Sequence, residues 1–316
     1  MSARRALLFA ALAMLFASLT ACGASRQSGI CGELPPPPTA QGDADAFQKQ
    51  ADAAWEQRAD ESQLRVAIDG WQKALAIDPS RAQLRVKLAR AHYFLADGHL
   101  RFDETREKEM VENLRAGTNE AELGLGQLYP NFRSKFCSRQ PYSVALQQLD
   151  KGATGAMYWY ATNLGKYALA TSIVEVLNQK DRIKAMMDLV KSLDPGFFHY
   201  AADRYFGAFF TKIPFPSGDL PKSQGHFEAS IAGAPYYLAT RVLLASMNAT
   251  KAENAALFKE HLDAVLAFDL DSRPDLKPEN AVEQRKAKEL LEEIDVYFPD
   301  YEPPAETEAA PAAEEE

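Results

Sequence analysis

The sequence has few side chains of the kinds that bind metals or act as nucleophiles. It contains five histidines and three cysteines among 316 residues. The histidines form no H-E-x-x-H pair, the cysteines form no C-x-x-C pair, and there is no G-x-S-x-G turn. Gly124 and Gly126 lie in a stretch rich in glutamate and leucine with no strand before it, which argues against a nucleotide-binding loop. We therefore predict no catalytic site, no cofactor and no metal site.

An excess of basic residues is also absent. Lysine and arginine number 35 and aspartate and glutamate 44, which gives a formal net charge of −9 and no patch suited to nucleic acid. Part of the acidity is local, because residues 301–316 are rich in proline, alanine and glutamate. Such a composition buries too little apolar surface to fold. We predict that this tail is disordered and that the chain has no nucleic-acid partner.

The first residues have the pattern of a secretory signal. Arg4 and Arg5 precede a run, residues 6–19, that has no charge and no proline. A transmembrane helix needs about 20 apolar residues, so this run is short for a membrane span. Small residues and a cysteine follow it. We predict that residues 1–21 are a signal peptide that is removed on export.

The end of this segment, Leu19-Thr20-Ala21-Cys22, resembles the lipobox of bacterial lipoproteins, in which cleavage before the cysteine accompanies its acylation. We predict that Cys22 carries the lipid and anchors the chain to a membrane on its periplasmic face. The alternative is an ordinary signal peptide with an incidental cysteine. Gly23 follows Cys22, and the lack of an aspartate there favours the outer membrane over the inner one.

The next segment, residues 22–42, is predicted to be a tether. It holds Gly, Ser and Gln and four consecutive prolines at positions 35–38, which favour an extended polyproline II spacer. The two remaining cysteines, Cys31 and Cys137, would lie in a compartment where disulfides persist. We predict that they are bonded to each other. The alternative is two independent thiols.

Residues 43–300 are predicted to be all-α. Alternating strand patterns are absent, and Ala, Leu, Glu, Lys and Gln fill long segments at helical period. Three segments share the spacing of the second helix of a tetratricopeptide repeat, in which small and aromatic residues pack before a proline ends the helix. They are Ala67-x3-Trp71-x2-Ala74-x4-Pro79, Ile183-x3-Met187-x2-Val190-x4-Pro195 and Ser223-x3-Phe227-x2-Ser230-x4-Pro235.

The repetition continues beyond two of these prolines. RVKLA at 85–89 and RVLLA at 241–245 each begin six residues after a proline, as expected of the first helix of the next pair. The prolines are not separated by multiples of 34 residues, so the repeats are irregular. We predict an irregular tetratricopeptide-like solenoid. The alternative is a generic helical bundle with coincidental spacing.

Four longer motifs carry a family resemblance. They are KGATGAMYWYATNLGKY at 151–167, RYFGA at 204–208, GDLPKSQGHF at 218–227 and YLATRV at 237–242. The chain resembles, from about residue 47 to 298, the T-component family of tripartite ATP-independent periplasmic (TRAP) transporters. The resemblance implies a periplasmic lipoprotein that partners the solute-binding P component and has no chemistry of its own. The resemblance leaves open whether the chain forms a homo-oligomer.

The sequence also leaves other functions open. A lipoprotein adaptor for envelope assembly would use the same solenoid without any transporter. An enzyme has the least support, because the residues form no recognisable catalytic motif.

One helix in the first motif suggests a binding site. Trp159, Asn163 and Lys166 share a face that mixes an aromatic ring with hydrogen-bonding groups. We hypothesise that they line a groove or channel. Tyr200 and Arg204, which are four residues apart on a later helix and therefore share a face, would line it as well. The ligand would be a largely apolar small molecule or lipid with one acidic group for Lys166 or Arg204. The alternative is a solvated surface with a partly covered tryptophan.

Overall fold

The computed structural model describes residues 29–214 and 216–301. The predicted signal peptide, the predicted lipidation site Cys22 and residues 302–316 of the predicted tail lie outside the described residues. The described part contains 14 α-helices and no strand, which confirms the all-α prediction. None of these helices is both long enough and apolar enough to cross a membrane.

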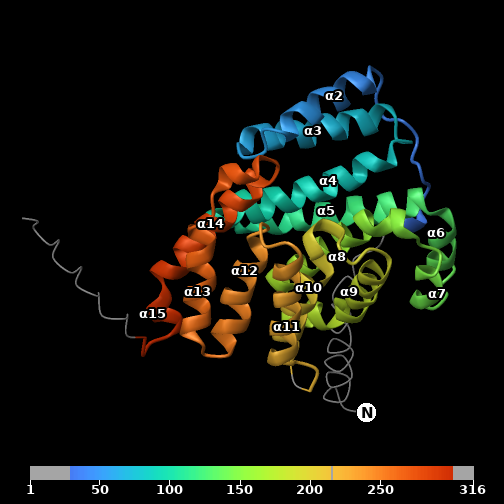
Figure 1. Ribbon diagram of the computed structural model, residues 1–316. Helices are drawn as coiled ribbons and strands as arrows, with labels where there is room; N and C mark the ends of the chain where they lie inside the picture. Colours follow the sequence, from blue (N-terminus) through green and yellow to red (C-terminus); the bar gives the residue numbers. More distant parts are fainter. Residues whose placement is uncertain (1–28, 215, 302–316) are drawn as a thin grey trace, which may run out of the picture.

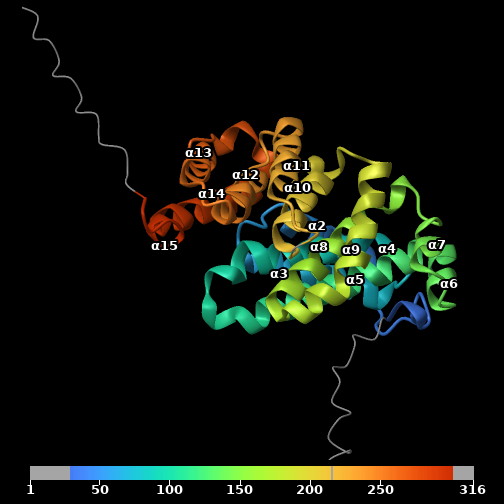
Figure 2. The ribbon, with the colours of Figure 1, turned by 90° about the horizontal axis from the view of Figure 1, so that it is seen from below.

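Most of the body consists of helix pairs in which each helix packs against the next one in the chain. The pairs are α2 (Ala44–Trp55) with α3 (Glu61–Ile77), α4 (Ala82–Phe94) with α5 (Glu107–Leu128), α8 (Thr154–Thr171) with α9 (Ile173–Leu193), and α10 (Phe197–Lys212) with α11 (Leu220–Gly233). The short helices α6 (Pro130–Cys137) and α7 (Tyr142–Leu146) come between the second and third pairs. In Figures 1 and 2 the α8–α9 pair lies between the α4–α5 and α10–α11 pairs.

The three predicted second helices are α3, α9 and α11, and a proline follows each of them within two residues. The small and aromatic residues of this frame in α3 and α11 are buried, and so are the larger Ile183, Met187 and Val190 in α9. In α11, the ring of Phe227 lies against Gly207 of α10, where a Cβ atom would come within 2.6 Å of it. The spacing of these segments in the sequence therefore corresponds to helix pairs in the structure.

The two RV-x-LA motifs also begin related structures. One lies in α4 and is followed by a π-helical segment, η2 (Leu95–His99). The other spans α12 (Ala239–Leu243) and the start of a second π-helical segment, η6 (Leu244–Ala249). A π-helix widens the turn by one residue and is often found near functional sites. Both segments border the cavity described below.

The last helices of the chain contact the first part of the solenoid. They are α13 (Ala255–Leu266), α14 (Lys277–Glu292) and α15 (Ile294–Tyr297). Arg58, which follows α2, donates two hydrogen bonds of 3.0 and 2.8 Å to the Glu279 carboxylate of α14. Figure 1 shows α14 beside the ends of α3 and α4. The solenoid is thus closed into a ring by contacts between residues more than 200 positions apart.

The described part of the predicted tether, residues 29–42, is attached to the body. Ile30 is fully buried beside Gly126, and Arg133 donates hydrogen bonds to the carbonyls of Ile30 and Gly32. The predicted disulfide between Cys31 and Cys137 is present. The first part of the predicted tether is therefore packed against the body, while the prolines at 35–38 are mostly exposed and lie outside any helix. The composition does not reveal that one isoleucine in this stretch is buried.

Candidate functional site

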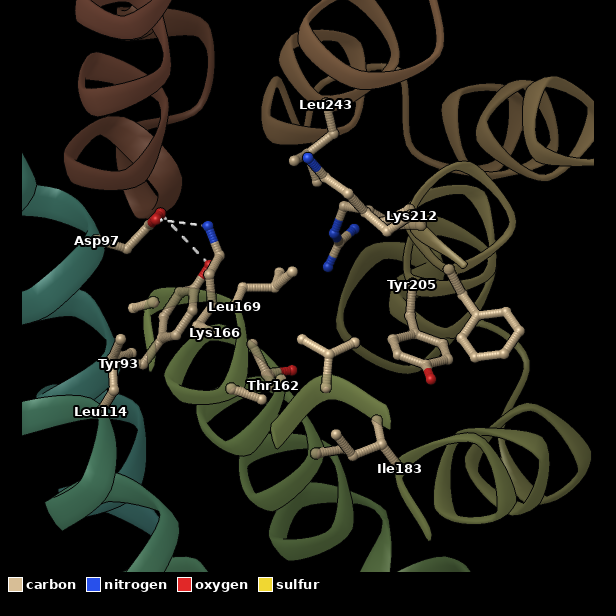
Figure 3. Close-up of a pocket in the computed structure, with 18 of the residues that line it drawn as sticks. Tyr93, Asp97, Leu114, Thr162, Lys166, Leu169, Ile183, Tyr205, Lys212 and Leu243 are labelled. Carbon is tan, nitrogen blue, oxygen red and sulfur yellow. Dashed lines mark hydrogen bonds and ion pairs between the residues drawn. The ribbon is translucent and has the colours of Figure 1, made fainter. Parts of the chain in front are cut away.

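A cavity of about 660 Å³ lies between helices of successive parts of the solenoid. Its walls come from η2, α5, α8, α9, α10 and η6, so four successive parts of the solenoid contribute to it. Figure 3 shows Thr162 and Lys166 of α8 on one wall and Tyr205 and Lys212 of α10 on another. A concave space of this size is typical of small-molecule sites, which span roughly 300–1,000 Å³.

The walls are mainly apolar with a few charged groups. The large aliphatic side chains are Met110, Leu114, Leu169, Val176, Ile183, Ile213, Leu243 and Met247. The charged side chains are one carboxylate, Asp97, and five cations, Arg101, Lys166, Lys180, Arg204 and Lys212. The cavity is therefore cationic, although the chain as a whole carries a formal charge of −9.

A second cavity of about 270 Å³ shares part of its lining with the first. Eight residues line both, among them Asp97, Arg101, Lys166 and Arg204, and we call this shared set of residues the neck. The remaining four are Tyr93, Tyr158, Leu243 and Ser246. The far wall of the second cavity carries four glutamates from α14 and its C-terminal end, at positions 279, 283, 289 and 293.

Asp97 of η2 is the centre of a buried charge cluster in the neck. Its carboxylate lies 2.9 Å from the Lys166 Nζ atom and 2.7 Å from the Lys286 Nζ atom. Lys286 also lies 2.7 Å from a Glu283 carboxylate oxygen. Figure 3 shows the contact between Asp97 and Lys166. Two carboxylates and two ammonium groups are thus brought together, and their formal charges cancel.

The pKa values in this cluster follow from the pairing. Burial raises the pKa of Asp97, but the Lys166 and Lys286 charges lower it more, so it lies well below its usual range. Burial lowers the pKa of Lys286, but Asp97 and Glu283 raise it more, so the net shift is upward. Both groups therefore remain charged near neutral pH.

Arg204 of α10 holds an unusual turn at the start of its helix. Phe198, His199 and Tyr200 have φ angles of 42°, 61° and 56°, the left-handed conformation that costs roughly 1–2 kcal/mol for each such residue. The Arg204 guanidinium donates to the carbonyls of Phe198 at 3.2 Å and His199 at 2.9 Å, and to the Tyr158 hydroxyl at 3.2 Å. These bonds hold three strained residues in one turn.

His199 lies within this turn, close to several cations. Burial lowers its pKa to about 4, with further lowering by the charges of Arg204, Arg273 and Arg90. Its ring stacks on Tyr237, with 4.7 Å between the ring centroids. His199 is therefore neutral at physiological pH and contributes an aromatic contact beside the neck.

Two of the five sequence-predicted site residues line the cavity, namely Lys166 and Arg204. Trp159 is 5% exposed and Asn163 is fully buried, with the Asn163 side-chain amide donating to the carbonyls of Ala89 and Trp159. They neither line the groove nor form a solvated surface, so both sequence interpretations are wrong for these two residues. The reason is that α8 contacts α4, α5 and α9, which cover it on most sides.

Tyr200 is also not among the lining residues. The spacing of four between Tyr200 and Arg204 would place them on one face only in a continuous right-handed helix. The left-handed backbone at Tyr200 breaks that relation, and its ring packs over Gly233 of α11 instead. The prediction for Tyr200 is therefore wrong.

The sequence interpretation missed several lining residues that the fold brings together. Asp97 and Arg101 lie in and just after η2, and Lys212 follows Arg204 by two helical turns on α10. The spacing of Arg204 and Lys212 was a usable signal, because residues eight apart share a helix face. No local pattern links Asp97 to Lys286, which is 189 residues away.

Comparison with known proteins gives one family. A family model described as TRAP transporter T-component matches residues 105–298, which is more than half of the chain. No curated protein matches the chain.

Proposed function

The chain belongs to the TRAP transporter T-component family, and we propose that it is the membrane-anchored accessory protein of a TRAP transporter that associates with the solute-binding P component. In this role its ring of helices is a scaffold and its larger cavity holds a ligand. The observation that carries the proposal is the cavity of about 660 Å³, which four parts of the solenoid enclose with apolar walls and a few charged groups.

The position of Cys31 limits how far the body would lie from the membrane. Cys31, which the disulfide fixes to α6, lies nine positions after Cys22, the proposed site of lipidation. A fully extended chain of this length spans roughly 30 Å, at 3.3–3.6 Å per residue. The proposed location is the periplasmic face of a bacterial membrane, with the outer membrane favoured. An anchor of this length would keep the body close to the lipid surface.

A pull-down from detergent-solubilised envelope tests the proposed partnership. The bait is the native lipoprotein with a C-terminal affinity tag, and the control is the same envelope from cells that express the untagged chain. Enrichment of a P-type solute-binding protein supports the proposal. Recovery of outer-membrane or cell-wall assembly proteins without any TRAP component contradicts it and favours the envelope-assembly adaptor instead.

A further inference from the structure

Arg204 differs from the other buried cations of this protein. Among the described residues, four lysine and arginine side chains are buried: Arg58, Arg85, Arg204 and Lys286. Three of them have a carboxylate partner within 3.0 Å. Arg58 pairs with Glu279, Arg85 pairs with Glu120, and Lys286 pairs with both Asp97 and Glu283. Arg204 is 5% exposed and forms no ion pair among the described residues; its guanidinium instead lies over the Tyr237 ring, 4.5 Å from the centroid. A buried charge is costly unless it is paired.

The guanidinium of Arg204 has hydrogen-bonding capacity left. It carries five N–H groups, and three of them donate to Phe198, His199 and Tyr158. Two N–H groups remain, one on Nε and one on Nη1, and Arg204 is among the residues that line both cavities. These two N–H groups do not share an edge of the guanidinium, so each can donate a single hydrogen bond to an oxygen of an acid group.

Lys166, the other cation predicted to bind an acid, is already neutralised. Its ammonium group pairs with Asp97, and the four charges of Asp97, Lys166, Glu283 and Lys286 sum to zero. An anion placed at Lys166 would have to compete with Asp97. Arg204 needs no such exchange, so it is the better receptor for an acidic group.

We propose that the candidate site binds an amphipathic anion, with a single acidic group paired to Arg204 in the neck and an apolar body lying in the larger cavity. This inference rests on the proposed ligand-holding function. Leu114, Ile183 and Ile213 would contact the apolar body. The source is either a membrane lipid that has an acidic group or a small apolar acid that a transporter carries, and both share this chemistry.

The charges of the two cavities orient such a ligand. The larger cavity adds Lys180 and Lys212 to the neck, whereas the smaller one adds four glutamates and one lysine, Lys286. Glu279, Glu283 and Glu289 are already paired with Arg58, Lys286 and Arg285, so the smaller cavity offers an anion no unpaired cation of its own. The larger cavity adds Lys212, which has no ion pair among the described residues. The acidic group therefore stops at Arg204, and the apolar body extends back toward the larger opening.

Calorimetric titration of the full mature chain in lipid nanodiscs tests the preference for an anion, with empty nanodiscs as the blank. The probes are 4-phenylbutyrate and the uncharged 4-phenylbutanol, which have the same apolar body. We expect the acid to bind at least tenfold more tightly than the alcohol. Equal affinity for acid and alcohol would overturn the assignment of an anion site while leaving a ligand-holding cavity in place.

Substitutions assign the preference to Arg204. Arg204→Met should abolish the preference for the acid, Arg204→Lys should keep most of it, and Lys184→Met, on the outer surface of α9, should leave it at the wild-type value. Retention of the full preference in a folded Arg204→Met protein would contradict the role of Arg204. If Arg204→Met does not fold, the acid-to-alcohol ratio of the wild-type chain still decides whether the cavity selects an anion.

Two further measurements separate the possible explanations. Dodecanoate that binds more tightly than 4-phenylbutyrate supports the anion site with a lipid source, and the reverse order supports it with a small-acid source.

The pull-down described above is repeated with folded Arg204→Met. If the variant loses the preference for the acid but still recovers the P-type protein, Arg204 is needed for anion binding and not for association with the P component. Failure of the wild-type chain to bind any of the probes would overturn the ligand inference and the ligand-holding role together, while association with the P component is tested independently.

Discussion

Asp97 of the neck and Lys286 of the smaller cavity, which are 189 residues apart in the sequence, form an ion pair of 2.7 Å. Asp97 belongs to the π-helical segment after α4, and Lys286 belongs to α14. Their contact joins the last long helix to an early repeat and at the same time forms part of the cavity wall. The pair therefore couples closure of the ring to the shape of the candidate site.

We expect Lys286→Met to lower the free energy of unfolding by about 3–5 kcal/mol, the usual cost of removing one partner from a buried ion pair. The variant leaves Glu283 buried without its cation and Asp97 with Lys166 alone. Urea denaturation followed by circular dichroism measures the change. Lys259→Met, which removes an exposed pair with Asp263 on α13, serves as the control and should cost less than about 1 kcal/mol. Equal losses in the two variants would contradict the prediction.

We expect the stability of the protein to fall between about pH 6.5 and pH 4 because of His199. Its pKa is lowered from 6.5 to about 4 in the folded chain, so the unfolded chain binds a proton in this interval and the folded chain does not. The stability is thus fully present above the unfolded value and is lost as pH falls. Asp97, whose folded pKa is also lowered, adds a further loss at lower pH, below its own unfolded value.

Urea titrations of the wild type and of His199→Asn at about pH 7 and about pH 5 measure this effect. Asparagine does not titrate and tolerates the left-handed backbone at position 199. The wild type should lose more unfolding free energy than the variant between the two pH values. An equal loss in both proteins would show that His199 does not cause the pH dependence.

We expect Cys31 and Cys137 to resist alkylation in the unreduced protein and to react after reduction under denaturing conditions. The bond closes a segment with a sequence separation of 106 residues. Loop-closure entropy predicts that Cys31→Ser with Cys137→Ser lowers the unfolding free energy by up to about 4–5 kcal/mol. Intact mass spectrometry measures the alkylation, and urea denaturation measures the stability. Two labelled thiols on the unreduced chain would reject the bond.

We expect Cys22→Ala to move the protein from the membrane fraction to the soluble periplasmic fraction, or to leave it uncleaved. The physical reason is that stable anchoring needs more than one acyl chain or an equivalent second signal, and this variant has none at position 22. Fractionation with immunoblotting and intact mass measures the outcome. Cys31→Ala, which removes a cysteine outside the lipobox, should remain in the membrane. A correctly processed Cys22→Ala chain that stays in the membrane would reject the anchor.

The sequence determined the helical class and the approximate frame of the helix pairs. Small and aromatic residues at fixed spacing before Pro79 and Pro235 identified α3 and α11, and larger apolar residues in the same frame before Pro195 identified α9. Close helix packing and the missing proline N–H both leave marks in the local sequence. The pairing of Cys31 with Cys137 followed from their number and from the expected compartment. These features depend on neighbouring residues or on simple counts.

Only the tertiary structure decided which residues form the candidate site. Helical period shows that Trp159, Asn163 and Lys166 share a face, but not that neighbouring helices cover the first two and that the third reaches the cavity. The same holds for Tyr200, which a left-handed turn directs toward α11. Burial and pairing depend on contacts between helices far apart in the chain, and a local pattern does not encode which distant helix arrives at a given face.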